Sequence, residues 1–105
     1  MERHELEDLR RQRAALGQPY LEFLRTGAMS AGLYVLPVGA HDGQAPHHED
    51  EVYIVLRGNG RFTAGNETVD ALPGDTLYVS AGIAHRFHDI TEELVLAVVF
   101  APPES

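Results

Sequence analysis

The sequence has 105 residues, which suits one domain, and it contains no cysteine, so disulfides and thiolate metal sites are excluded. The formal net charge of -8 makes nucleic acid a poor partner, because phosphate binding needs clustered basic side chains. No stretch approaches the roughly 20 apolar residues of a membrane-spanning helix, and the charged first residues, MERHELEDLRRQR, predict no signal peptide and a cytoplasmic protein.

Residues 2–16 are predicted to form a helix. Leu6 and Leu9 recur among glutamate and arginine at helical spacing. Gly17 and Pro19 are typical of the end of a helix, so the helix and its connection should occupy the first part of the chain.

After Gly27 the chain becomes a succession of short runs rich in Tyr, Val, Ile, Phe and Thr, separated by Gly, Asn and Pro turns. The predicted strands are residues 33–38, 51–57, 60–64, 67–69, 76–80, 84–89 and 94–100. This pattern indicates an all-β sandwich or barrel over residues 28–105, with residues 1–27 holding the helix and its connection. The last five residues, APPES, are expected to be frayed.

The predicted last strand is apolar on both faces. Leu94, Leu96, Val98 and Phe100 alternate with Val95, Ala97 and Val99. A strand with one face toward water should have polar residues there, so either the N-terminal helix or a second subunit should cover it. We therefore expect a homodimer.

Histidines and acids gather at two places in the chain. Imidazole and carboxylate together are a recurring ligand set for divalent metals. On the later strand His85 should face the interior, while Arg86 and His88 should face solvent. A barrel closed by the two strands could bring His47, Glu51 and His85 to one centre.

Two spaced motifs resemble those of the cupin superfamily. The stretch from Gly39 to Gly58 reads GAHDGQAPHHEDEVYIVLRG and is similar to the first motif, G-x5-H-x-H-x3/4-E-x6-G. His47 and Glu51 occupy the places of the second histidine and the glutamate. Ala45 stands in the place of the first histidine.

The second motif, G-x5-P-x-G-x2-H-x3-N, is similar to GDTLYVSAGIAHRFHD, which begins at Gly74. Gly82 and His85 match, whereas Ser80 replaces the proline and Asp89 the asparagine. The resemblance covers roughly residues 28 to 100 and implies a small double-stranded β-helix of the jelly-roll type.

By resemblance, His47, Glu51 and His85 would bind a divalent metal ion, one of Fe, Mn, Ni or Zn. The position left open by Ala45 would be filled by water or by the amide oxygen of Gln44, in preference to His48 or Glu49. Outside this set, a structural role is favoured over a functional one. His41 and Asp42 are expected in a surface loop, and residues 48–50 are expected to form a solvated acidic turn. The aromatic residues are expected to be core rather than pocket lining: Tyr53, Phe62, Tyr78 and Phe87.

The leading hypothesis is a metal-dependent enzyme acting on a small organic molecule, with oxygenase, isomerase or decarboxylase chemistry. Tyr53 shares a strand face with Glu51 and is the candidate for proton transfer or substrate hydrogen bonding. A non-catalytic module that binds a small ligand, with a structural or anchoring metal, is the alternative, and a purely structural dimeric barrel is a third possibility.

Overall fold

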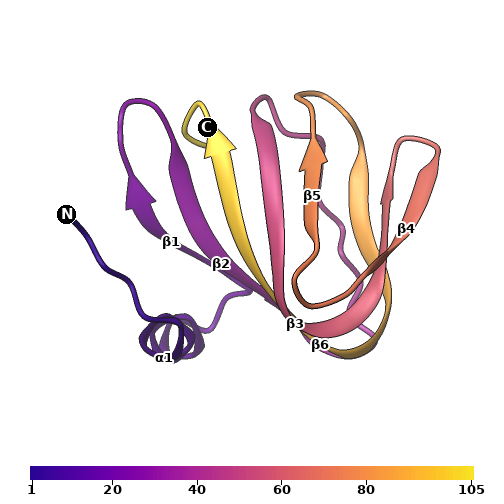
Figure 1. Cartoon of the computed structure of the whole chain (residues 1–105), viewed down its shortest axis with the longest axis horizontal. Coiled ribbons are helices and arrows are strands. Elements are labelled where there is room, and N and C mark those ends of the chain that lie inside the picture. Colours follow the sequence, from indigo (N-terminus) through magenta and orange to yellow (C-terminus); the bar gives the residue numbers. More distant parts are fainter.

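The structure, a computed structural model that describes residues 1–105, is built almost entirely from antiparallel β-sheet (Figure 1). One helix, α1 (Leu6–Leu16), precedes six strands: β1 (Tyr20–Arg25), β2 (Ser30–Leu36), β3 (Asp50–Ala64), β4 (Glu67–Ala71), β5 (Thr76–Val79) and β6 (His85–Ala101). The strands are hydrogen-bonded in the order β1-β2-β6-β3-β4, and β5 also pairs with β3. The expectation of an all-β fold with a short N-terminal helix is confirmed. No helix is long and apolar enough to cross a membrane.

Strands β3 and β6 form a bent ribbon that shapes the molecule (Figure 1). They pair along most of their length, with register shifts between Val55 and Arg61. At the bend Gly58 has a φ of 100°, and a Cβ there would lie 2.2 Å from the carbonyl oxygen of Glu93. Only glycine can occupy this position without displacing backbone, so Gly58 allows β6 to follow β3 through the bend.

The sequence-based division of these strands was wrong. Residues 51–57 and 60–64 belong to β3, and residues 85–89 and 94–100 belong to β6, with Ala84 just before it. The glycines between the first two segments produce a bend rather than a chain reversal, because pairing with β6 resumes beyond it. Strand β1 was not predicted at all. It lies in the segment expected to be a connection and pairs with β2.

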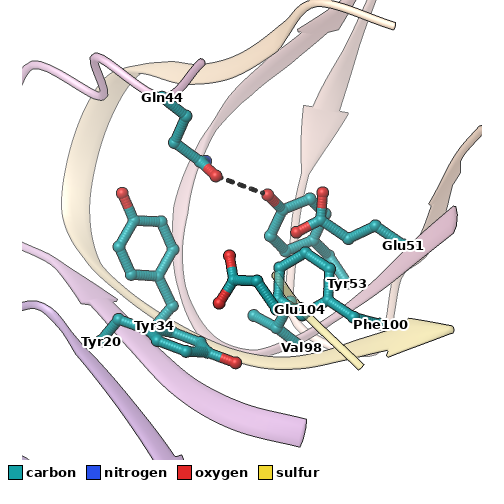
Figure 2. Close-up of a pocket in the computed structure, with 8 residues that line it drawn as sticks. All are labelled: Tyr20, Tyr34, Gln44, Glu51, Tyr53, Val98, Phe100 and Glu104. Atoms are coloured by element: carbon teal, nitrogen blue, oxygen red, sulfur yellow. Dashed lines mark hydrogen bonds between the residues drawn. The ribbon is translucent and has the colours of Figure 1, made fainter. Parts of the chain in front are cut away.

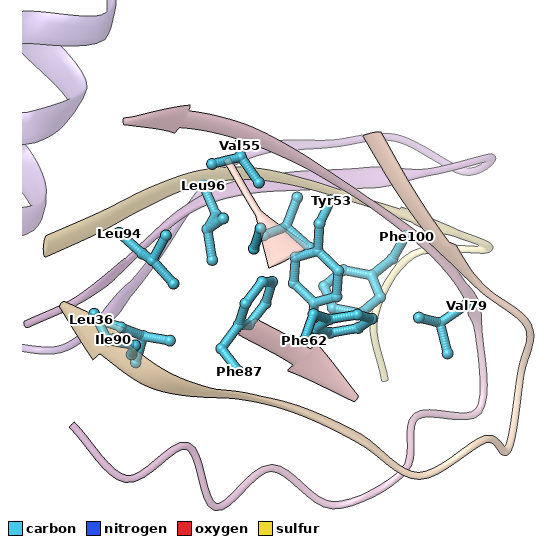
Figure 3. Close-up of a cluster of buried hydrophobic side chains, with 12 residues drawn as sticks. Leu36, Tyr53, Val55, Phe62, Val79, Phe87, Ile90, Leu94, Leu96 and Phe100 are labelled. Atoms are coloured by element: carbon cyan, nitrogen blue, oxygen red, sulfur yellow. The ribbon is translucent and has the colours of Figure 1, made fainter. Parts of the chain in front are cut away.

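The main core fills the space enclosed by the bent sheet (Figure 3). Twelve buried apolar residues form it: Leu36, Tyr53, Val55, Phe62, Ala71, Val79, Phe87, Ile90, Leu94, Leu96, Val98 and Phe100. Alternate residues of β6 supply one wall, as the period of a strand requires.

A second, smaller cluster lies on the outer face of β2 and β6. Leu9 of α1 packs there with Leu33, Val35 and Val95. The helix therefore covers part of the outer face of the last strand, which is apolar on both faces. Ala97 and Val99 remain half-buried, and the expected homodimer stays a prediction.

The C-terminal segment is docked, so the expectation of a frayed tail was wrong. The backbone N–H of Glu104 donates to Ser30 Oγ at 2.9 Å, and Arg25 donates to the Glu104 carbonyl oxygen at 3.0 Å. The N–H of Ser105 donates to a carboxylate oxygen of Glu49 at 3.2 Å. Glu49 is only 4% exposed, so the acidic turn is not uniformly solvated as expected.

Candidate metal centre

The bend of the ribbon creates the candidate site. Glu51 pairs with Phe100 near one end of the β3–β6 ladder, whereas His85 pairs with Ala64 at the other end. Ala64 lies thirteen positions after Glu51 along β3, which in a flat ribbon would be a distance of roughly 40 Å at about 3.3 Å per residue. The bend folds the ends together, so His85 Nε2 lies 2.9 Å from Glu51 Oε1.

His47 completes the group from the loop before β3. Its Nε2 lies 4.0 Å from Glu51 Oε2, and one ligand atom from each of His47, Glu51 and His85 lies within 4.8 Å of the others. The side chains of Glu51 and His85 are each 1% exposed, and that of His47 is 19% exposed. The three side chains need only small adjustments to share a metal ion at ordinary bond lengths of about 2.0 to 2.2 Å.

The carboxylate of Glu51 supplies the test of whether these residues fit a metal. Both of its oxygens are buried, and neither accepts a hydrogen bond from a backbone N–H. The imidazole of His85 is in contact with Oε1 at 2.9 Å, and that of His47 lies 4.0 Å from Oε2. A carboxylate buried in this way lowers the stability of the folded protein unless a cation or a set of hydrogen-bond donors compensates its charge. The donor set of two imidazoles and one carboxylate therefore suits a divalent metal ion.

The orientation of His85 also fits a metal ligand. Its Nδ1–H donates to the carbonyl oxygen of Ile83 at 2.8 Å, which leaves Nε2 to face Glu51. A backbone contact of this kind selects the ligating nitrogen and holds the ring in place. Burial by itself lowers the pKa of His85, but the Glu51 carboxylate and the Ile83 carbonyl together raise it above the ordinary value of 6.5.

Gln44 and Tyr53, the other two predicted site residues, lie beside these three side chains. The Oε1 atom of Gln44 is 2.9 Å from His47 Nε2 and accepts a hydrogen bond from the Tyr53 hydroxyl at 3.2 Å. That hydroxyl also lies 3.1 Å from His85 Nε2. Burial and the charge of Glu51 raise the pKa of Tyr53 far above its ordinary value, so the phenol stays protonated and serves as a hydrogen-bond donor.

Asp42 holds Gln44 in place, and its expected position in a surface loop was wrong. It is 4% exposed and accepts hydrogen bonds from the Tyr34 hydroxyl at 2.7 Å, the Phe87 N–H at 2.8 Å and the Gln44 side-chain amide at 2.9 Å. Because the amide nitrogen of Gln44 donates to Asp42, its oxygen is turned toward His47. The Gly-rich composition of this loop gave no signal of the anchoring role.

A cavity of about 220 Å³ opens beside the centre (Figure 2). Its lining residues are Tyr20, Tyr34, Gln44, Glu51, Tyr53, Val98, Phe100 and Glu104. Figure 2 shows the Glu104 carboxylate turned into the same space as that of Glu51. Its Oε2 lies 3.4 Å from His47 Nδ1. Burial raises the pKa of Glu104; the nearby His47 opposes this and the surrounding carboxylates reinforce it.

Sequence reasoning missed five of these lining residues: Tyr20, Tyr34, Val98, Phe100 and Glu104. Tyr20 lies in the segment expected to be a connection and Glu104 in the expected frayed tail, and no motif marked either. Burial raises the pKa of both tyrosines well above the ordinary value, so both hydroxyls stay protonated. Of the four aromatics weighed as pocket lining, only Tyr53 lines this cavity, and Phe62 and Phe87 are core as expected. The expectation that Tyr78 is core was wrong, since it is 64% exposed.

The remaining histidines lie outside the centre. His88 is directed away from it and lies 2.7 Å from Thr63 Oγ1 and 2.8 Å from a carboxylate oxygen of Asp89. Its side chain is 18% exposed, so it is less solvated than expected. His48 is exposed, and His4 lies beside Glu2 near the N-terminus.

Comparison with known proteins identifies the family. The uncharacterized protein SCO3923 of Streptomyces coelicolor is 49% identical over 105 residues, which is 100% of both chains. The crystal structure of TT1209 from Thermus thermophilus is similar, with a TM-score of 0.78 and 25% identity over 98% of this chain and 99% of that chain. The DMSP lyase DddQ from Ruegeria pomeroyi shares the fold with a TM-score of 0.71 and 18% identity, over 84% of this chain and 49% of that one. The sequence model of the cupin domain matches residues 32–101, which is more than half of the chain. This protein belongs to the cupin domain family.

Proposed function

We propose that this cupin is a metal-dependent enzyme with oxygenase- or isomerase-like chemistry on a small organic molecule. His47, Glu51 and His85 would hold a divalent ion of Fe, Mn, Ni or Zn, with the amide oxygen of Gln44 beside it. The observation that carries this proposal is the Glu51 carboxylate, which is buried between two imidazoles and has no backbone N–H donating to either oxygen.

The residues around the centre have separable roles. When bound, the metal would supply a Lewis acid for a substrate oxygen. Tyr53, protonated at neutral pH, would donate a hydrogen bond to the substrate where it now donates to Gln44. Val98 and Phe100 give the cavity an apolar wall that excludes water from one side of the substrate.

Elemental analysis of tag-free protein purified without chelator tests the metal. We expect about one equivalent of a divalent ion per chain. Loaded protein would then be assayed by oxygen uptake and product analysis on a panel of catechols, diketones and sugars. Absence of metal from both purified and reloaded protein would contradict the proposal.

The alternative is a non-catalytic module that binds a small ligand. The raised pKa of Tyr53 favours it, because a phenol that keeps its proton is a poor general base. Glu104 favours the enzyme instead, since it brings to the cavity a carboxylate that is not part of the ligand set. Ligand binding without turnover by the metal-loaded protein would support the alternative.

We also propose that the protein is a homodimer. Val52 pairs with Tyr78 on one side and Val99 on the other, and Ile54 pairs with Ala97, so an apolar stripe crosses the outer face of the sheet. Ile54 is 36% exposed and Tyr78 is 64% exposed. Light scattering at micromolar concentration should give the mass of two chains, and Ile54→Glu should shift it toward one.

A cytoplasmic location completes the proposal. The absence of cysteine fits a reducing compartment, where disulfides do not form. Cell fractionation with a tagged protein would test it.

A further inference from the structure

The cavity beside Glu51 combines aromatic walls with acidic groups. Four of its eight lining residues carry aromatic rings, two are glutamates, and none is a lysine or arginine. Such a lining disfavours phosphates and carboxylates as ligands. It is suited to a molecule that carries positive charge.

The rings are arranged as the sides of a box. The ring of Tyr20 lies 6.1 Å from that of Tyr34 at 71°, and 6.4 Å from that of Phe100 at 80°. In the core, Phe87 lies closer to its neighbours, at 4.5 Å from Phe62 and 4.9 Å from Tyr53. Near-perpendicular rings at the wider spacing allow one cation to lie within about 6 Å of all three centroids, which is the range of a cation–π interaction.

Glu104 supplies the negative charge at this box. The guanidinium of Arg25 binds the carboxylate of Glu22 and the backbone carbonyl of Glu104. The side chain of Glu104 is therefore left facing the cavity and His47. If Glu51 is neutralised by a metal ion, Glu104 still carries charge for a ligand.

We propose that this cavity binds a small organic cation, a methylated ammonium group held by Tyr20, Tyr34 and Phe100, with an oxygen-bearing end directed toward Glu51. The inference rests on the proposed function, because it names the substrate class of the same site. Methylation is favoured because three aromatic rings supply most of the contact surface around the cationic end, where an –NH₃⁺ group would lose water contacts that one carboxylate, Glu104, replaces only in part. The volume of about 220 Å³ is below the roughly 300 Å³ of a pocket for a drug-sized ligand, so the molecule must be small.

Two probes of the same shape test the charge. Calorimetric titration of the protein with choline and with 3,3-dimethylbutan-1-ol, its neutral carbon analogue, compares a cation with a matched alcohol. We expect choline to bind at least about tenfold more tightly. Equal affinity for the two compounds, or no binding of choline, would overturn the inference.

Substitutions in the cavity test which side chains bind choline. Tyr20→Leu removes one ring and should weaken choline binding by about tenfold, whereas Tyr20→Phe keeps the ring and should change it by less than about twofold. Glu104→Gln should weaken choline roughly threefold or more and leave the neutral alcohol unchanged. Tyr78→Leu, at an exposed ring outside the cavity, is the matched control and should have no effect. An equal loss in Tyr20→Phe and Tyr20→Leu would contradict the cation–π assignment.

The titrations are run on metal-loaded and metal-free protein, with metal content measured in each sample. Loss of choline selectivity with a full equivalent of metal bound would overturn this inference and leave the proposed function standing. Selective choline binding by a protein that takes up no metal would support the cation site and contradict the metal centre.

Discussion

The interior of this protein has two ends with opposite chemistry, and Tyr53 lies where they meet. At one end Tyr53 packs against Phe62 and Phe87, with ring centroids 5.5 and 4.9 Å away. At the other end its hydroxyl faces Gln44 and His85, beside the buried carboxylate of Glu51. The apolar end stabilises the fold, whereas the polar end costs stability unless a cation is bound, which is the usual sign of a functional site.

Removing a ring from the apolar end should have the largest effect. Phe87 is 0% exposed, so Phe87→Ala should lower the free energy of unfolding by about 3 to 5 kcal/mol through lost burial and a cavity. Chemical denaturation measures it. A change below about 1 kcal/mol would mean that the surrounding side chains close the cavity. It would contradict the view that the apolar end is the part that stabilises the fold.

Removing a ligand from the polar end should instead abolish metal binding with little effect on folding. We expect His47→Ala and His85→Ala to weaken metal affinity by more than about 100-fold, because each removes one of only three strong ligands. His88→Ala, outside the centre, is the control and should retain one equivalent. Full metal occupancy in His85→Ala would place the metal elsewhere.

Neutralising Glu51 should weaken metal binding and, at the same time, raise the stability of the metal-free protein. Glu51→Gln should abolish tight metal binding yet stabilise the metal-free protein by about 1 to 3 kcal/mol at a pH where His85 is neutral, since it removes a buried charge that no cation then compensates. Denaturant titration of both proteins after chelator treatment gives the comparison. Destabilisation of the metal-free variant would show that the carboxylate is already compensated.

The pH dependence should reverse when metal binds. The pKa of His85 is raised in the folded protein, so its contribution to stability in the metal-free state is complete below about pH 6.5 and is lost as the pH rises through the folded pKa. Metal binding requires the neutral imidazole, so the increase in melting temperature from metal should grow over the same rise in pH. Melting curves from pH 5.5 to about 8.5, with and without metal, would show the two trends. A metal-induced increase that is independent of pH would argue against His85 as a ligand.

The smallest effect is expected at the tail. Ser30 is 0% exposed and its hydroxyl accepts the Glu104 N–H, so Ser30→Ala should cost about 1 kcal/mol. If the tail positions Glu104, the same change should also weaken choline binding. Unchanged choline affinity would mean that Arg25 alone holds the segment in place.

Local patterns in the sequence predicted much of the fold. The helical spacing of Leu6 and Leu9 with the stop at Gly17 predicted α1 to within a few residues, and period-two runs after Gly27 predicted an all-β domain. These signals are read over a few neighbouring residues. The motif resemblance added the longer-range expectation that His47, Glu51 and His85 share one centre, and the structure brings these side chains together.

Tertiary structure alone decided how the centre is surrounded. Glu51 and His85 meet because pairing continues through the bend at Gly58, whereas the sequence suggested a turn there. Tyr20 and Glu104 reach the cavity from β1 and the tail, which lie outside residues 32–101 matched by the family model. Spacing along a chain reports which residues share a face of one element, but contacts between distant segments depend on how the whole sheet bends and packs. The sequence by itself therefore determined the fold class and the ligand types, and the folded chain determined the shape and charge of the cavity beside them.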